Sequence, residues 1–546
     1  MAMNMSVHDI PGSQVHEDGG YMSYWELSEH AVIIYWHIGL ALLAWAGVLP
    51  VAVMLSISHS RFALPSQFVF LAVNGLALSI SHLYNKRTPN LYDNNVHGRI
   101  GWIITCTAMS WIFIALIQAY VGRSAAPGYK SVQSMITGSS TEYHQVEDGE
   151  SSDALRWSDD HGQSPTLLSR SLDGYPVSSS MGSVGRHLSR LDMMQTQDAP
   201  RGSFVTRSFS RCVACFARIF SARSLRLFYV LIERTVLVQG FVAVMSGTIV
   251  YGGIGRDIGI FNVLAHYIKG SIFFFYGLLT LGRWMGAFAD YGWAWNAKLK
   301  KEVHSCQTRA VPSAEFTESF VMWLYGVTNV FLEHLAAWGK AWTAQDLEHV
   351  SISILFFGGG LLGMIVESNT IREILSNSVL SSQALQDLKG ISDQPHQYGF
   401  SMNPVPSLVI FLLGKMMSSH HQGSILSTAI HTQWGSMLIG FALARYLTYI
   451  IMYIVTPTSF LPSRPPTEVI ASFCLIAGGL SFIISNRDTV TALESYDLDA
   501  MFTFTIITGI TALIMAWTVI TFMIKSWALQ KERISRYGES HASPLD

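Results

Sequence analysis

The residues of this chain that could carry chemistry are mainly histidines, of which there are 19 among 546 residues. Neutral imidazole is the commonest metal ligand in proteins and also serves as an axial ligand of haem iron. When the histidines are placed on the apolar segments described below, ten of them fall at one end of those segments. Because these histidines lie at one end only, we interpret them as members of common binding sites and not as separate residues at the membrane interface. The ten are His30, His37, His82, His97, His266, His334, His349, His420, His421 and His431.

The first candidate site consists of His37 and His97 in the N-terminal part of the chain. Each histidine lies near the same end of its own apolar segment. A b-type haem needs two facing imidazoles on neighbouring helices as axial ligands. The pair therefore predicts a haem b site.

The second candidate site lies in the C-terminal part and combines imidazoles with carboxylates. That donor set suits copper, iron or zinc, or a carboxylate that orients a ligand histidine through a hydrogen bond. The alternative is a group of solvated side chains at the ends of helices. The candidate metal ligands are His266, Glu333, His334, Glu348, His349, His421 and His431.

Charged residues also occur inside apolar segments, at the end opposite the histidines. Ionisable groups within a membrane are costly and usually face a partner or a polar cavity. Two interpretations stay open: a buried ion-paired network that fixes helix register, or a polar pathway for a transported solute. The residues are Glu233, Arg234, Arg283, Glu367 and Arg445.

The elements that position these residues must lie in a lipid bilayer. Half of the chain is hydrophobic, 13% is charged, and the mean hydropathy is +0.31. An ordinary soluble protein carries about 25% charged residues. The net charge of −2 shows no overall basic excess that would indicate binding to nucleic acid. We find no nucleophile elbow, Walker motif or metalloprotease signature, so the sequence does not decide whether the protein is an enzyme.

About eleven apolar segments approach the roughly 20 residues that a helix needs to cross the hydrocarbon core. The sequence therefore predicts an all-α, polytopic transmembrane helical bundle. The expected spans lie near residues 31–57, 64–84, 99–121, 227–251, 263–287, 317–336, 348–367, 405–421, 426–454, 467–485 and 500–524.

The loops predict orientation and domain organisation. Lys and Arg gather in loops that would be cytoplasmic if the N-terminus is outside and the C-terminus is inside. Residues 122–224 are rich in Ser, Gly, Asp and Arg and predict a disordered cytoplasmic loop that could bind cytoplasmic partners. The predicted order is an outside segment at 1–29, a three-span module at 30–121, that loop, an eight-span domain at 225–526 and a cytoplasmic tail at 527–546.

Two motifs in the N-terminal module resemble known proteins. The stretch from His37 to Trp45, followed by Leu49 and Pro50, is similar to the first core helix of ascorbate-reducible b-type cytochromes and related ferric reductases. The stretch from Asn95 to Trp102 is similar to a later haem-ligand helix of that group. The resemblance implies that His37 and His97 are the axial ligands of one haem. Gln67 stands where a second haem would need a histidine.

The chain as a whole resembles the fungal Ytp-type membrane proteins, which join such a module to a larger multi-span domain. The segment after Glu348, with the glycine-rich span and His421, also resembles a family of small seven-span proteins. The leading hypothesis is a multi-pass protein of the plasma membrane, an endomembrane or a mitochondrial membrane. Its outer histidines would bind haem or a transition metal for electron transfer or metal reduction. The alternatives are a transporter of a metal ion or small solute, and a non-catalytic membrane organiser.

Overall fold

A computed structural model describes the helical part of the chain and several of its loops. The described residues are 23–124, 222–297, 311–333, 339, 341–368, 370–372, 374–375, 400–419 and 422–541. Within these ranges every element of regular structure is a helix.

The N-terminal helices start with a long helix whose middle turn is irregular. Helix α1 spans Ala31–Leu42, a π-helical segment follows at Leu43–Val48, and α2 spans Leu49–Ile57. Helix α3 spans Ala63–Arg87, and α4 spans His97–Ser124.

The C-terminal helices follow the residues that the structure leaves undescribed after α4. They are α8 at Ala222–Gly252, α9 at Gly259–Met285, α10 at Ala314–Glu333, α11 at Ala344–Glu367, α14 at Val405–Ser419, α15 at Ile425–Ile454, α16 at Pro466–Ile484, α17 at Arg487–Ser495 and α18 at Ala500–His541. A short 3-10 turn at Ala289–Tyr291 follows α9.

These helices confirm the predicted all-α, multi-pass architecture. Nine of them, within the described part of the chain, are long and apolar enough to cross a membrane. The two other predicted spans also form helices, α10 and α14. Helix α14 has 15 residues, and α10 carries three glutamates. The orientation of the two termini stays a prediction.

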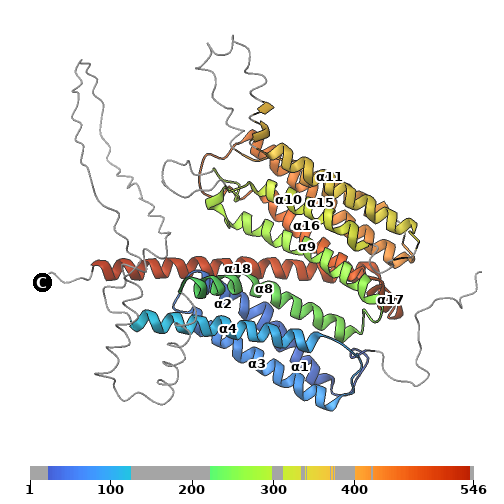
Figure 1. The fold of residues 1–546 in the computed structure, drawn as a ribbon, viewed down its shortest axis with the longest axis horizontal. Helices are drawn as coiled ribbons and strands as arrows, with labels where there is room; N and C mark the ends of the chain where they lie inside the picture. Colours follow the sequence, from blue (N-terminus) through green and yellow to red (C-terminus); the bar gives the residue numbers. More distant parts are fainter. Residues whose placement is uncertain are drawn as a thin grey trace, which may run out of the picture. The chain divides into compact units, whose positions relative to one another are not determined.

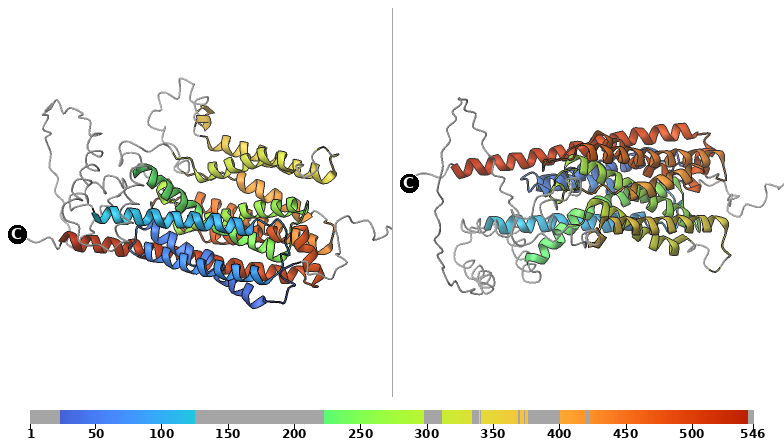
Figure 2. Two further views of the ribbon diagram at one scale, coloured as in Figure 1. Left: turned by 60° about the horizontal axis from the view of Figure 1, so that its bottom comes forward. Right: turned by 90° about the horizontal axis from the view of Figure 1, so that it is seen from above.

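Residues 1–109 and 233–546 form one compact unit, and residues 110–232 form a second. In the first unit, α9 packs on α16, α10 packs on α11, and α15 packs on both α14 and α16. Helices α1 and α2 pack on α3, and α18 packs on both α2 and α16. Figures 1 and 2 show α18 as the longest helix of the chain. All site residues discussed below lie in this first unit.

Glycines bring the paired C-terminal helices into close contact. A Cβ added at Gly270 of α9 would lie 2.6 Å from the carbonyl oxygen of Gly479 in α16, and the reverse holds at Gly479. Gly414 of α14 and Gly435 of α15 face each other in the same way. Small residues at such crossings let helix backbones approach, which is how helices commonly associate in lipid.

The π-helical segment is linked to the far end of the sequence. Pro50 has no backbone N–H, so it cannot donate to the carbonyl of Ala46, four residues earlier. The indole Nε1–H of Trp517 in α18 donates to that carbonyl at 2.8 Å. The proline therefore exposes an acceptor in the middle of the first span, and the last helix satisfies it.

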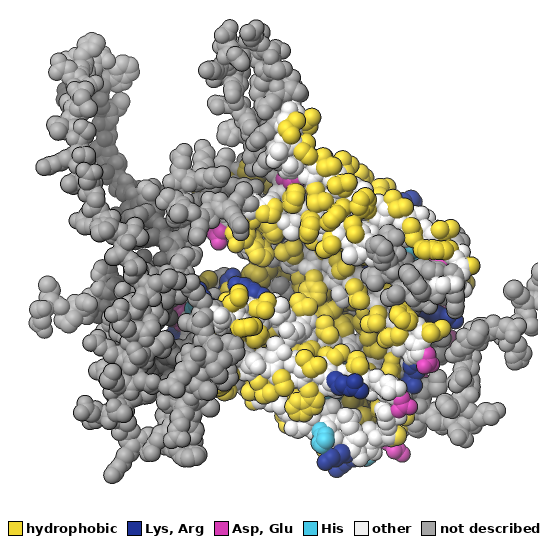
Figure 3. Space-filling model, in the orientation of Figure 1, with side chains coloured by type: hydrophobic (Ala, Val, Ile, Leu, Met, Phe, Trp, Pro, Cys, Tyr) yellow, Lys and Arg dark blue, Asp and Glu magenta, His cyan; other side chains and the backbone are white. Residues whose placement is uncertain are grey.

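The outer surface of the helices suits lipid. Large apolar side chains such as Val32, Ile354 and Leu513 are 61–70% exposed. On the face drawn in Figure 3, hydrophobic side chains cover most of the described helices, and charged side chains lie mainly near the helix ends. This distribution agrees with burial of the helices in a bilayer.

Candidate functional site

The structure brings His37 of α1 and His97 of α4 together. Their ring centroids are 6.5 Å apart, and the ring planes are inclined at 72°. With metal–nitrogen bonds of about 2 Å on each side and ring centres about 1 Å beyond the nitrogens, two imidazoles on one metal ion have centroids about 6 Å apart. The observed separation is therefore compatible with both rings binding one metal ion.

Hydrogen bonds determine which nitrogen of each ring is free to bind a metal. The Nδ1 atom of His37 lies 2.9 Å from the carbonyl oxygen of Ala77, which can only accept, so Nδ1 carries the proton. The Nδ1 atom of His97 lies 2.9 Å from Oγ of Ser246, whose single hydroxyl proton is donated to the carbonyl of Ala243. His97 must therefore donate as well. In both rings the Nε2 atom keeps its lone pair.

Two neighbouring helices hold the rings of this pair in place. Helix α3 supplies Ala77, and α8 supplies both Ser246 and Gly247. A Cβ at position 247 would lie 3.2 Å from Cε1 of His97, so the glycine lets the ring lie against the α8 backbone. The sequence predicted the two histidines but not Ser246, which follows His97 by 149 residues.

The C-terminal histidines gather only in part. His266 of α9, His349 of α11 and His431 of α15 lie close enough to interact electrostatically. Nδ1 of His266 bonds to the carbonyl of Asn262 in its own helix, and its ring stacks on Phe482 with a centroid distance of 5.2 Å. His431 is 7% exposed, and its Nδ1 bonds to Ser427 of its own helix.

The remaining residues of the predicted metal group cannot be placed beside these three. His334 and His421 lie outside the described residues, and only the backbone of Glu333 is described. The side chain of Glu348 is exposed. Within the described ranges, no group of three or more His, Cys, Asp or Glu side chains could hold a metal ion. Metal binding at this end of the C-terminal helices stays a prediction.

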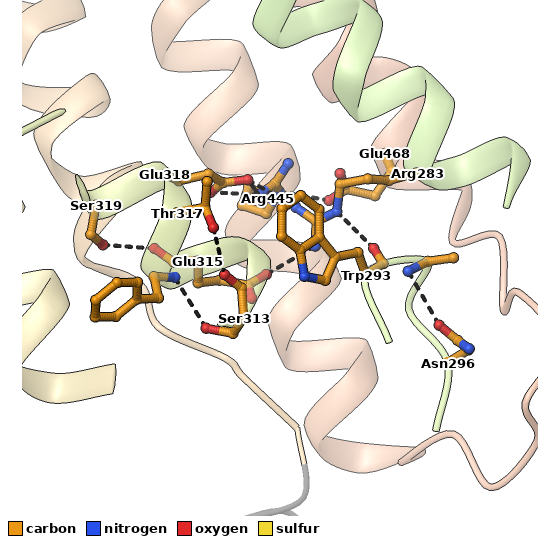
Figure 4. A network of polar contacts seen from close by, with 12 residues as sticks. Arg283, Trp293, Asn296, Ser313, Glu315, Thr317, Glu318, Ser319, Arg445 and Glu468 are labelled. Carbon is orange, nitrogen blue, oxygen red and sulfur yellow. Dashed lines mark hydrogen bonds and ion pairs between the residues drawn. The ribbon is translucent and has the colours of Figure 1, made fainter. Parts of the chain in front are cut away.

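A second constellation, at the opposite end of the C-terminal helices, is a buried network of charges. It joins Arg283 of α9, Glu315 and Glu318 of α10, Arg445 of α15 and Glu468 of α16 (Figure 4). All five residues are less than 10% exposed. The sequence singled out the two arginines as an ion-paired network or a polar pathway, and the structure shows the ion pairs.

The three glutamates of this network were missed. Glu315 and Glu318 stand at the edge of the expected sixth span, and Glu468 stands in the first turn of α16, where acidic residues are common as helix-capping groups. The signal that could have found them is charge balance, because two arginines buried in spans require carboxylate partners.

The other predicted inner charges do not join the network. Glu233 of α8 accepts a hydrogen bond from the hydroxyl of Ser56 in α2. Glu367 at the end of α11 pairs with Arg372 at 3.2 Å. Arg234 is exposed. The expectation of one inner site built from these charges therefore holds for Arg283 and Arg445 alone.

Comparison with known proteins agrees with this architecture. The family model "Protein YTP1-like, C-terminal" matches residues 239–526, and a domain of unknown function, DUF2427, matches residues 21–121. The second match carries no haem assignment, so the resemblance to b-type cytochromes stays a prediction. No solved structure matches the chain.

Several yeast proteins are similar over long stretches. An uncharacterised membrane protein of Schizosaccharomyces pombe is 32% identical over 502 residues, which cover 90% of this chain and 93% of the relative. An uncharacterised membrane protein of Saccharomyces cerevisiae is 41% identical over 54% of this chain and 47% of the relative. Protein YTP1 of the same yeast is 26% identical over 46% of this chain and 44% of its own length. The chain therefore belongs to the YTP1-like family of multi-pass membrane proteins.

Proposed function

We propose that His37 and His97 bind the iron of one b-type haem and that the protein takes part in electron transfer across or along the membrane. The observation that carries this proposal is the pair of Nε2 lone pairs on rings whose centroids are 6.5 Å apart. Each ring is already oriented through its Nδ1 atom, as metal-binding histidines usually are. A haem iron held there would supply one-electron redox chemistry.

The donor set favours haem over a bare metal ion at this position. A structural or catalytic zinc or copper site needs three or four protein ligands. Around His37 and His97, the described residues supply no third metal ligand. A haem brings four nitrogens of its own and needs only the two imidazoles.

Absorption spectroscopy of the purified protein tests the proposal. Protein expressed in a haem-replete host should show a Soret band and one haem per chain, with a redox-dependent change in its visible bands. His37→Ala or His97→Ala should abolish the band. His82→Ala is the matched control, because that exposed histidine lies at the same end of α3. Folded wild-type protein without haem, or full haem content in both alanine variants, would overturn the assignment.

A further inference from the structure

The buried charge network of α9, α10, α15 and α16 contains more negative than positive charge. Two arginines face three glutamates, so the fully ionised network has a net charge of −1. The exposed fractions of Arg283, Arg445 and Glu468 are 2%, 0% and 0%. An uncompensated charge at such depth is strongly unfavourable, and proteins usually avoid it by binding a proton or a counter-ion.

The ion pairs link glutamates and arginines alternately, and the first and last residues of this series are glutamates. Arg283 donates to Glu315 at 3.0 Å and to Glu318 at 2.8 Å. Arg445 donates to Glu318 at 3.4 Å and to Glu468 at 2.9 Å. The indole of Trp295 lies under both guanidinium groups, 4.4 and 5.2 Å from its ring centroid.

The carboxylates of this network differ in how fully they are hydrogen-bonded. Glu318 faces both arginines, whereas Glu468 receives one bond, from Nε of Arg445 to its Oε1. Its Oε2 atom is buried without a hydrogen-bond partner, and so is Nη2 of Arg445. The nearby hydroxyl of Tyr449 is also buried without a partner, and the hydroxyl of Tyr276 lies beside the carboxylate of Glu318. The unsatisfied acceptor is therefore at Glu468, beside groups that could share a proton.

A small cavity adjoins one end of the network. This cavity of about 20 Å³ is lined by Arg283, Trp295 and Glu315 together with loop residues that include Ser313 and Ser401. A polar cavity of this size has room for about one water molecule. The cavity adjoins the Arg283 and Glu315 end of the network, and Glu468 is not among its lining residues.

We propose that this network is a proton-binding site and that the exchangeable proton resides on Oε2 of Glu468. Binding adds the proton to the carboxylate oxygen and makes the network neutral; release restores the net charge of −1. Arg283 and Arg445 interact electrostatically with Glu468. The other titratable groups of the network are Tyr276 of α9, Glu315 and Glu318 of α10, and Tyr449 of α15. A proton-binding group buried between membrane helices is what a proton-coupled carrier requires. The site is independent of the haem proposed at His37 and His97.

Infrared spectroscopy of the full-length protein in nanodiscs tests this proposal. The wild-type protein should show the carbonyl band of a protonated carboxyl group, shifted in D2O and lost when the pH is raised. Glu468→Gln should remove that band, because the amide keeps the acceptor for Arg445 but cannot ionise. Glu233→Gln and Glu367→Gln are the matched controls, since both change a buried glutamate outside the network.

Three results would contradict a proton on Glu468. A wild-type protein without a titrating protonated carboxyl band contradicts the proposal, whether or not the Glu468 variant folds. A band that persists in Glu468→Gln and disappears in either control also contradicts it. A thermal stabilisation by sodium that choline does not reproduce, and that Glu468→Gln abolishes, would identify a bound cation in place of the proton.

Discussion

At the scale of single residues, the proposed haem site depends on the two histidines and equally on the groups that hydrogen-bond to them. The sequence identified His37 and His97 because imidazoles at the same end of two spans are unusual. It could not identify Ser246 or the Ala77 carbonyl, because a serine in a span and a backbone carbonyl have no distinctive sequence signal. The proton positions on the two rings follow only from these contacts.

Replacing Ser246 with alanine should weaken haem binding without removing a ligand. The substitution removes the acceptor that orients His97 through its Nδ1 atom. Loss of such a partner usually lowers metal affinity about 10–100-fold. Haem transfer to apomyoglobin, followed by absorbance, measures the change. Thr248→Ala is the control, since its hydroxyl contacts the Met245 carbonyl of its own helix and the Tyr267 hydroxyl of α9; an equal effect there would contradict the expectation.

Tyr92 provides a second residue-level prediction, in the loop between α3 and α4. Its hydroxyl lies 2.8 Å from the carbonyl of Ile254, and the guanidinium of Arg256 lies 4.8 Å from its ring centroid. Burial raises the pKa of Tyr92, so the hydroxyl stays a neutral donor at physiological pH. Tyr92→Phe should destabilise the protein by about 1 kcal/mol. Thermal unfolding in detergent measures this, and the exposed Tyr496→Phe should be neutral.

At the scale of helices, hydropathy predicted where the elements lie but not how they meet. Residues 317–336 were expected to form a span, yet α10 begins at Ala314 and so includes Glu315. The partners that make this glutamate a buried residue, such as Arg283, lie tens of residues away in the sequence. Three consecutive glycines in a span are typical of a close-packing face, and the contacts of Gly360 with α10 show that α11 uses one of them in this way.

The three consecutive glycines of α11 should respond differently to substitution. A Cβ at Gly360 would lie 2.7 Å from the carbonyl oxygen of Ser319 in α10, whereas a Cβ at Gly358 meets nothing within 4 Å. We expect Gly360→Val to separate α10 from α11 and to cost about 1–3 kcal/mol. The melting temperature in detergent and the monodisperse fraction on gel filtration report the loss. Gly358→Val is the matched control, and equal damage from both substitutions would refute the assigned packing face.

At the scale of the whole molecule, the low charge of the chain was enough to predict a multi-pass membrane protein. It was not enough to count spans, because α14 is short and α10 carries buried glutamates that belong to the charge network. It also could not show that the first and last helices are in contact. The proposed haem site lies on α1 and α4, whereas the proposed proton site lies on α9, α10, α15 and α16, so the two proposals rest on different helices.

The orientation of the protein across the membrane is a separate prediction. The excess of Lys and Arg in alternate loops predicts the N-terminus outside and the C-terminus in the cytoplasm. A glycosylation acceptor inserted near residue 20 should then be modified, and one inserted near residue 540 should not. Gel mobility before and after glycosidase treatment gives the result. Modification at the C-terminal position alone would reverse the orientation and place the histidine end in the cytoplasm.

The hydrogen bond from Trp517 to Ala46 has a consequence for biogenesis. The two residues are 471 positions apart, so the first span enters the bilayer long before its donor is synthesised. Until α18 inserts, the carbonyl that Pro50 leaves without a donor lies in hydrocarbon, where an unsatisfied polar group is costly. Final assembly of the N-terminal helices therefore waits for the last helix. A ribosome that stops before Ala500 releases a chain with this defect exposed, a distinctive mark by which membrane quality control could recognise incomplete protein.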